Sequence, residues 1–248
     1  MEILAVVPAR YESQRFPGKV LAKLGDRPMV QWVYEATKSC PAFTKVLVAT
    51  DSEKVADCVR GFGGEVAITR SDHRTGTDRV AEVAQRYPDM QVVVNVQGDQ
   101  PFVTAEMLTS LIQPYLDGAT PEMTTLGCPL DLVDIETDYS DPNVVKVITD
   151  RQGNALYFSR SPIPYRRNPA QIATLPVFHH LGLYAFRQDF LSKYAKLAPT
   201  PLEQCEGLEQ LRVLEHGYRI VVCHTAQSVL EVNTPAEMQR AQAMIANT

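Results

Sequence analysis

Short apolar runs, each ending at a polar loop, constrain the fold of this chain most strongly. They cover residues 3–7, 46–49 and 92–96, and helix-like stretches cover 28–38, 52–62, 77–87 and 104–116. Strands buried on both faces have this appearance, and the repeated order of strand and helix is typical of a sheet covered on both sides. The sequence therefore predicts an α/β fold with a mixed, mainly parallel sheet and helices on both faces.

The middle of the chain breaks this rhythm. Residues 144–149 and 155–159 read as two short strands around a turn at 150–153, and a proline-rich loop follows at 161–176. Further strands are expected at 180–186 and 219–223, with helices at 202–216 and 235–245. We predict one domain over 1–248, in which 140–180 is a small insertion or dimer contact region.

Composition excludes several classes of protein. A net charge of −5 argues against a general nucleic-acid-binding protein, which needs a basic surplus to neutralise phosphates. No apolar run approaches the roughly 18 residues of a membrane span. The five cysteines are odd in number and form no CxxC pair, so reduced thiols and a cytoplasmic location are expected.

The strongest local signal is the loop after the first strand. It carries Arg10, Arg15 and Lys19 within ten residues, and Gly18 allows close approach of the backbone. A triphosphate carries roughly four negative charges, and cations with backbone N–H groups at this edge of a sheet suit it. The alternative is a solvated basic loop. A P-loop motif and a dinucleotide-binding glycine fingerprint are both absent.

Two further polar loops could contribute to a binding site at the same edge of the sheet. Asp99 follows the third buried strand beside Gly98, where a Mg²⁺ ligand is expected, although a structural turn aspartate is the alternative. The loop 69–79 carries N–H and C=O groups that can read the edge of a base, with Thr77 as a candidate helix N-cap.

At these motifs the chain resembles the 3-deoxy-manno-octulosonate (Kdo) cytidylyltransferase family, also called CMP-Kdo synthetase. The resemblance runs nearly end to end and depends on the order of its segments. These segments are 8–11, 15–19, 48–51, 76–79, 94–99, 155–160, 180–184 and 208–212.

The resemblance implies a Rossmann-like nucleotidyltransferase fold, a homodimer, and Mg²⁺, CTP and a sugar acid as the bound species. It implies that Arg10, Arg15 and Lys19 hold the CTP phosphates near Ser13, and that Arg10, Lys19 and the metal ligand Asp99 act in catalysis. Thr75, Gly76 and Gln97 are then expected at the cytidine. The segments of the family that line the sugar-acid pocket match Arg160, His180, Tyr184, Glu209 and Gln210. An arginine suits the carboxylate of a sugar acid.

Two positions depart from the family pattern. Asn233 stands where the family usually has a second metal-binding aspartate, and Gln100 stands where glutamate is commoner. Asn233 offers a neutral carbonyl oxygen to a metal, and Glu231 would lie on the same side of a strand and could supply the missing charge.

The expected reaction is nucleotidyl transfer from CTP to Kdo, with release of pyrophosphate. One alternative changes the acceptor to an amino-Kdo or another nonulosonic acid. A second is a catalytically silent nucleotide-binding homologue, and a third is a nicotinamide dehydrogenase, against which the missing glycine fingerprint counts.

Overall fold

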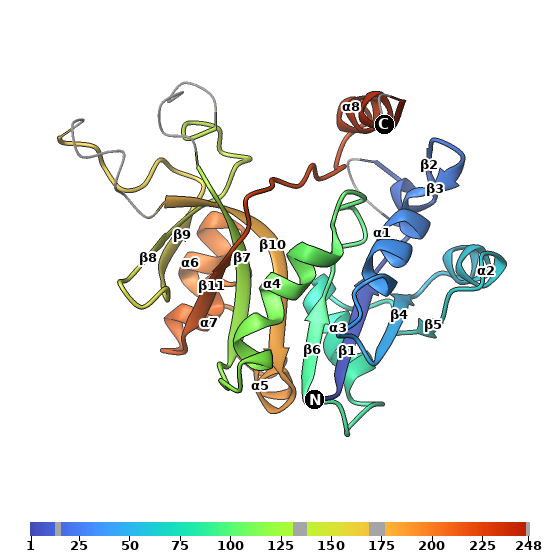
Figure 1. Ribbon diagram of the computed structural model, residues 1–248, viewed down its shortest axis with the longest axis horizontal. Coiled ribbons are helices and arrows are strands. Elements are labelled where there is room, and N and C mark those ends of the chain that lie inside the picture. Colours follow the sequence, from blue (N-terminus) through green and yellow to red (C-terminus); the bar gives the residue numbers. More distant parts are fainter. Residues whose placement is uncertain (13–15, 131–137, 169–176, 247–248) are drawn as a thin grey trace. The chain divides into compact units, whose positions relative to one another are not determined.

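The chain forms two compact units (Figure 1). The computed structural model describes residues 1–12, 16–130, 138–168 and 177–246. The first unit combines Met1–Thr109 with Val229–Thr248, and the second is Ser110–Ser228. The second unit contains all of 140–180 and extends beyond it on both sides; the predicted dimer contact there stays a prediction.

Four parallel strands form the sheet of the first unit. Their order is β6 (Val92–Asn95), β1 (Ile3–Pro8), β4 (Lys45–Thr50) and β5 (Val66–Ile68). All residues of β6, and β1 from Ile3 to Val7, are buried. Their apolar side chains form the core because burial on both faces removes them from water.

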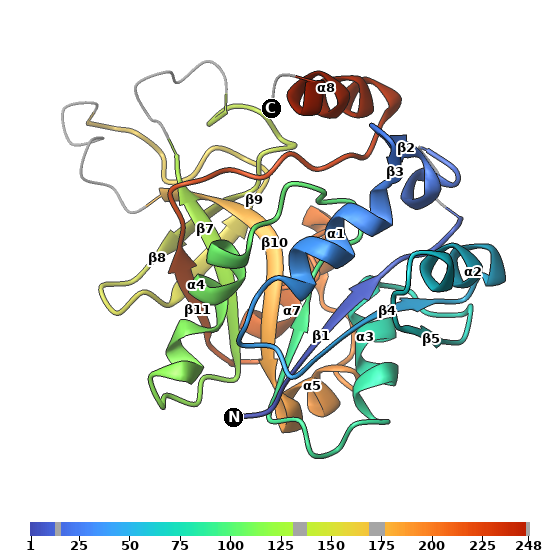
Figure 2. The same cartoon turned by 45° about the vertical axis from the view of Figure 1, so that its right-hand side comes forward.

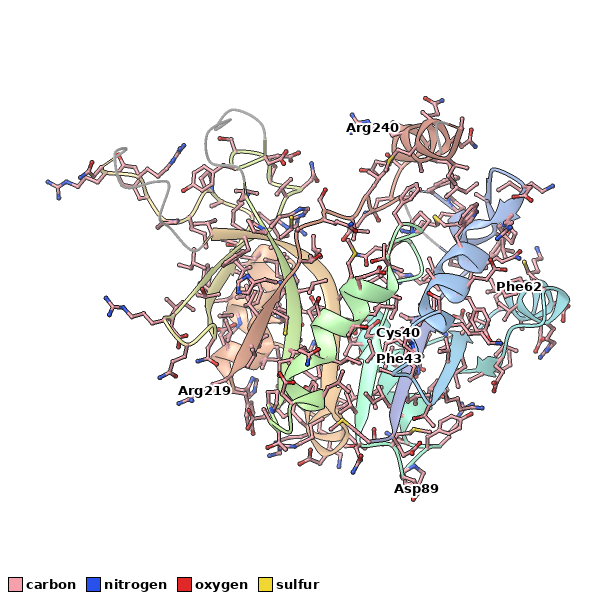
Figure 3. The ribbon with its side chains drawn as sticks, viewed as in Figure 1. Cys40, Phe43, Phe62, Asp89, Arg219 and Arg240 are labelled. Carbon is pink, nitrogen blue, oxygen red and sulfur yellow. The ribbon has the colours of Figure 1, made fainter. Side chains whose placement is uncertain are left out.

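The helices of this unit alternate with its strands. They are α1 (Met29–Lys38), α2 (Glu53–Gly61) and α3 (Gly76–Ala84), followed by α4 (Ala105–Leu116), which runs into the second unit. Cys40 and Phe43 lie in the turn from α1 to β4 (Figure 3). The hairpin of β2 (Lys23–Leu24) and β3 (Arg27–Pro28) packs against α8 (Pro235–Ala246).

The strand order places a crevice beside β1. The connections from β1 to β4 and from β4 to β5 lead outward on one side of β1, whereas the connection through α3 returns to β6 on its other side. Right-handed crossovers therefore put α1 and α2 on one face of the sheet and α3 on the opposite face. Ligands bind at such a reversal, beyond the carboxyl ends of the strands.

The second unit is built on a mixed sheet (Figure 2). β7 (Met123–Pro129) pairs in parallel with β11 (Ile220–His224) and antiparallel with β10 (Val177–Arg187). β10 also pairs with β8 (Lys146–Thr149), which forms a hairpin with β9 (Ala155–Ser159). The helices α5 (Gln188–Tyr194), α6 (Pro201–Glu206) and α7 (Leu211–Glu215) follow β10.

Most elements predicted from the sequence are confirmed, including the hairpin of β8 and β9, but one predicted helix needs correction and some elements, among them β7 and α5, were not predicted. The single helix predicted over 202–216 is two helices, because Gly207 takes a left-handed conformation (φ 63°) that ends α6. Strand β7 was not predicted, since Thr124 and Thr125 interrupt its apolar run. Both threonines are buried and donate to backbone carbonyls, of Leu111 and Leu183.

Within the described residues, no helix combines the length and apolar character needed to cross a bilayer. All five cysteines lie in described parts of the chain, and all are free.

Replacing Gly98 with alanine tests the close approach of the β1 and β6 ends. A Cβ atom at Gly98 would lie 2.8 Å from the carbonyl oxygen of Pro8. We expect Gly98→Ala to lower the free energy of unfolding by roughly 1–3 kcal/mol, measured by chemical denaturation, because backbone must shift. Gly61→Ala is the matched control, since its Cβ would meet nothing within 4 Å; equal stability of the two variants would contradict the close approach.

Candidate active site

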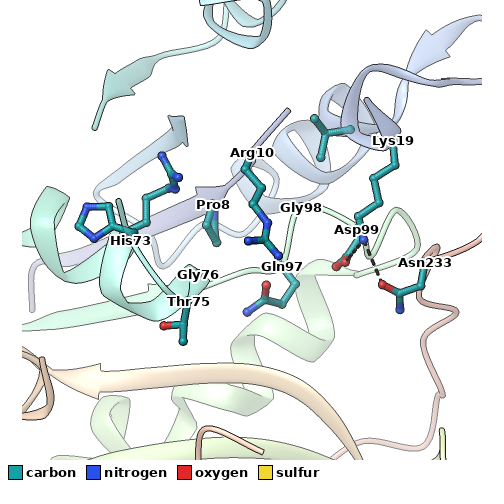
Figure 4. A pocket seen from close by; sticks show the side chains of 12 residues that line it. Pro8, Arg10, Lys19, His73, Thr75, Gly76, Gln97, Gly98, Asp99 and Asn233 are labelled. Atoms are coloured by element: carbon teal, nitrogen blue, oxygen red, sulfur yellow. Dashed lines mark hydrogen bonds and ion pairs between the residues drawn. The ribbon is translucent and has the colours of Figure 1, made fainter. Parts of the chain in front are cut away.

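A polar pocket lies at the carboxyl ends of β1 and β6, where the strand order reverses (Figure 4). Its cavity has a volume of about 260 Å³. The lining residues come from the loops after β1 and β6, from the start of α3 and from the segment before α8. They are Pro8, Arg10, Lys19, Val20, His73, Thr75, Gly76, Arg79, Gln97, Gly98, Asp99 and Asn233.

Lys19 is the cation at the centre of one side of this pocket. The N–H of Gly18 donates to the carbonyl of Tyr11, which brings the two ends of the loop together and places Lys19 at the start of a short 3-10 helix, η1 (Lys19–Leu21). The Lys19 ammonium lies 2.6 Å from a carboxylate oxygen of Asp99 and 3.0 Å from the side-chain oxygen of Asn233. Both side chains of the ion pair are largely buried, 13% and 22% exposed, so this contact is less screened by water than a surface pair.

A second carboxylate, that of Glu231, contacts the amide nitrogen of Asn233. Its two oxygens accept from the Asn233 amide at 3.2 Å and from the Gln100 amide at 3.1 Å. Desolvation of the carboxyl group and the charge of Asp99 raise the pKa of Glu231, and the two amides oppose that shift. This segment does not form the strand that the sequence suggests, yet the side chains of Glu231 and Asn233 do contact each other.

The start of α3 orders the opposite side of the pocket. Thr75, not Thr77, is the N-cap, and it forms a capping box with Asp78. The Thr77 hydroxyl is buried instead and accepts from Asn95, whose side-chain oxygen accepts from the Gln97 amide at 3.3 Å. Gln97 is thereby fixed at the pocket wall through two side chains from β6 and α3.

Two lining residues with ionisable side chains, Arg79 and His73, are not among the predicted site residues. Arg79 is 3% exposed, donates to Thr69 and pairs with Asp51 at 3.0 Å. His73 hydrogen-bonds Glu82 on α3. One sequence signal could have identified Arg79. It is a charged residue on the face of the predicted helix that also carries the buried residues Val80 and Val83. A buried arginine needs a partner such as Asp51, and only the fold shows that pairing.

The second unit holds a buried polar chain centred on His180. The Gln210 amide lies 3.3 Å from Nδ1 of His180, Nε2 lies 2.9 Å from the Thr125 hydroxyl, and the Tyr184 hydroxyl donates to Gln210 at 3.1 Å. Since the amide donates to Nδ1 and the Thr125 hydrogen goes to the Leu183 carbonyl, the imidazole proton is on Nε2 and the ring is neutral. Burial, together with the charge of His179, lowers the pKa of His180 to about 3.

Arg160 and Glu209 lie in the same unit. The Arg160 guanidinium donates to the carbonyls of Glu206 at 2.8 Å and Pro142 at 3.0 Å, which fixes its plane. The buried Lys146 ammonium donates to three backbone carbonyls, including that of Arg160. Burial lowers the pKa of Lys146. Glu209 accepts from the Tyr194 hydroxyl at 3.4 Å.

Residues 4–220 match the sequence model of the cytidylyltransferases. The chain is also 66% identical over 245 residues to the 3-deoxy-manno-octulosonate cytidylyltransferase of Acaryochloris marina, covering 99% of this chain and 98% of the relative. The chain belongs to this cytidylyltransferase family. The enzyme of the same name from Synechococcus elongatus is 55% identical over 243 residues, with 98% of each chain covered.

A solved structure supports the same assignment. CMP:2-keto-3-deoxy-manno-octonic acid synthetase, in complex with CTP, superposes with a TM-score of 0.91 at 37% identity, over 100% of this chain and 99% of the other. The predicted resemblance and α/β nucleotidyltransferase fold are therefore confirmed.

The predicted site residues of this cytidylyltransferase fall into two groups. The pocket of the first unit brings together Arg10, Lys19, Thr75, Gly76, Gln97, Asp99 and Asn233. Ser13 and Arg15 lie outside the described residues. In the second unit, His180, Tyr184 and Gln210 form one hydrogen-bonded cluster, whereas the hydrogen bonds given above for Arg160 and Glu209 go to other partners. The catalytic and binding roles of all these residues stay predictions.

The neutral, buried His180 predicts a pH dependence of stability for this cytidylyltransferase. Its pKa of about 3 in the folded state lies below the ordinary value of 6.5, so the unfolded chain binds more protons between these values. Stability should therefore fall as the pH falls below about 6.5, by about 2 kcal/mol between pH 7 and pH 5. Chemical denaturation of His180→Gln, which cannot titrate, should show a correspondingly smaller loss; identical pH slopes for the two proteins would refute the shifted pKa.

Proposed function

We propose that this chain transfers CMP from CTP to Kdo, giving CMP-Kdo and pyrophosphate. The single observation that carries the proposal is the pocket at the β1–β6 reversal, in which Arg10 lines the same cavity as the ion pair of Lys19 with Asp99. The curated relatives at 66% and 55% identity carry the name of this activity, and the relative solved at 37% identity holds CTP.

In the proposed reaction the anomeric hydroxyl of the sugar acid attacks the α-phosphorus of CTP. A new C–O–P link forms, the bond between the α-phosphorus and the oxygen that bridges to the β-phosphate breaks, and pyrophosphate leaves with the electron pair. The proton of the attacking hydroxyl passes to water. Phosphoryl chemistry of this kind depends mainly on positioning and on charge neutralisation. Arg10 and Lys19 supply positive charge for the phosphates and the leaving pyrophosphate, and Thr75, Gly76 and Gln97 contact the cytidine.

Mg²⁺ is the proposed cofactor, and the donor set fits it. Asp99 and Asn233 both present oxygen atoms, and these atoms already converge on one positive charge, the Lys19 ammonium. Among the described residues no three His, Cys, Asp or Glu side chains gather into a metal site, so substrate phosphates would complete the coordination. When bound, the ion would polarise the α-phosphate and lower the pKa of the attacking hydroxyl.

The sugar acid is proposed to bind through Arg160, His180, Tyr184, Glu209 and Gln210. The fixed plane of the Arg160 guanidinium suits a carboxylate, which accepts two parallel N–H bonds. The neutral imidazole of His180 and the amide of Gln210 already have partners within the chain, and sugar hydroxyls, which both donate and accept, would take the place of those partners. An amino-Kdo or another sugar acid is the alternative acceptor, and a panel of sugar acids offered with CTP would rank them by kcat/KM.

The decisive experiment measures pyrophosphate release with CTP, Mg²⁺ and Kdo. We expect turnover that requires all three, and a loss of roughly 100-fold or more in Asp99→Ala, because the charge that holds the metal is removed. Glu53→Gln, an exposed carboxylate on α2, serves as the control and should keep full activity. CTP binding without pyrophosphate release in the unmodified protein would indicate the catalytically silent alternative, and near-normal turnover of Asp99→Ala would refute its role.

We also propose a homodimer that uses the region 140–180. Leu156 and Tyr165 in this region are 60% and 90% exposed, and burying these side chains against a second copy of the chain would remove apolar surface from water. Light scattering should give a dimer mass, and the double variant Leu156→Asp with Tyr165→Asp should shift it to a monomer. A monomeric unmodified protein, or an unshifted variant, would contradict this interface. The cytoplasmic location stays a prediction.

A further inference from the structure

The backbone at Asn233 is held on both sides. The N–H of Val232, which is fully buried, donates to the Asp99 carbonyl at 2.9 Å. The N–H groups of Asn233 and Thr234 both donate to the Glu237 carboxylate, at 2.7 and 2.8 Å. This anchoring leaves the rotation of the Asn233 side chain as the main freedom at this position.

The two ends of the Asn233 amide are not equivalent. Its nitrogen donates to Glu231 at 3.2 Å, and its oxygen accepts from Lys19 at 3.0 Å. The reversed orientation would set the NH₂ group against the ammonium and the carbonyl against the carboxylate, which are two repulsive contacts. Lys19 and Glu231 therefore fix the same orientation from opposite ends.

Glu231 is itself held in place. The Gln100 side chain, which is fully buried, donates to the carboxylate oxygen that Asn233 does not use. Glu231 and Gln100 lie 131 positions apart in the sequence. This contact ties the segment before α8 to the loop after β6, and it points the carboxylate toward the Asn233 amide.

We propose that Glu231 is a positioning residue that keeps the side-chain oxygen of Asn233 directed at the metal position. The inference rests on the proposed function, in which Lys19 turns to the CTP phosphates. Lys19 then no longer orients Asn233, and Glu231 is the remaining partner that distinguishes its oxygen from its nitrogen. Glu231 touches neither the substrate nor the metal in this role, and it acts through Asn233.

Mn²⁺ titrations followed by electron paramagnetic resonance, with CTP present and no sugar acid, test this role without turnover. We expect Glu231→Gln to weaken Mn²⁺ binding by about 10-fold or more, the range for residues that orient metal ligands. Asn233→Asp should make Glu231 unnecessary, because the two carboxylate oxygens are equivalent and need no orientation. In the Asn233→Asp background, Glu231→Gln should therefore weaken Mn²⁺ binding by a several-fold smaller factor than it does when Asn233 is present.

Control variants distinguish a failure of the positioning role from a failure of the proposed function. Glu53→Gln should bind Mn²⁺ as the unmodified protein does, and Glu231→Ala provides a second variant if Glu231→Gln is poorly folded. Equal losses of Mn²⁺ affinity with and without the Asn233→Asp substitution would mean that only the charge of Glu231 matters. Unchanged Mn²⁺ binding in both Glu231 variants would mean that Glu231 has no role at the metal position. Either result overturns the positioning role and leaves the proposed function standing. If the unmodified protein binds no Mn²⁺ with CTP and releases no pyrophosphate with Kdo, the proposed function fails as well.

Discussion

The loop after β6 passes so close to the end of β1 that Gly98 has no room for a side chain beside the Pro8 carbonyl. This close approach follows from the parallel pairing of the two strands, whose carboxyl ends meet at one edge of the sheet. The chain leaves β1 and β6 in different directions there, so their loops open a crevice instead of covering each other. Every described residue assigned to the nucleotide lies on the loops, the helix start or the returning C-terminal segment that border this crevice.

Opposite charges share this crevice before any substrate binds. Lys19 is neutralised by Asp99 and its ammonium also contacts Asn233, while Glu231 adds a second carboxylate behind the amide. The ion pair reduces the cost of burying Lys19 and Asp99, because each of these charges has a partner of opposite sign. In the proposed reaction, Lys19 would turn to the triphosphate and Asp99 to the divalent cation, which together carry both signs of charge.

The second unit buries a group of uncharged polar side chains. His180 is kept neutral by burial and by a hydrogen-bond chain in which each donor meets an acceptor, from Tyr184 through Gln210 to Thr125. Satisfied networks of this kind hold side chains in one orientation and avoid the cost of unpaired polar groups. Lys146 follows the same principle, since three carbonyls accept from its buried ammonium.

The sequence alone determined the parallel α/β pattern and the family. It also placed the loop cations and Asp99 directly after buried strands. Buried strands and motif order are local signals, so they can be read without coordinates. It did not determine that Thr75 rather than Thr77 caps α3, that Gly207 divides a helix, or that β7 is a strand despite its threonines. The tertiary structure alone decided that Asp51 pairs with Arg79 and that Gln100 holds Glu231, because these contacts join positions far apart in the chain and depend on how the strands are ordered.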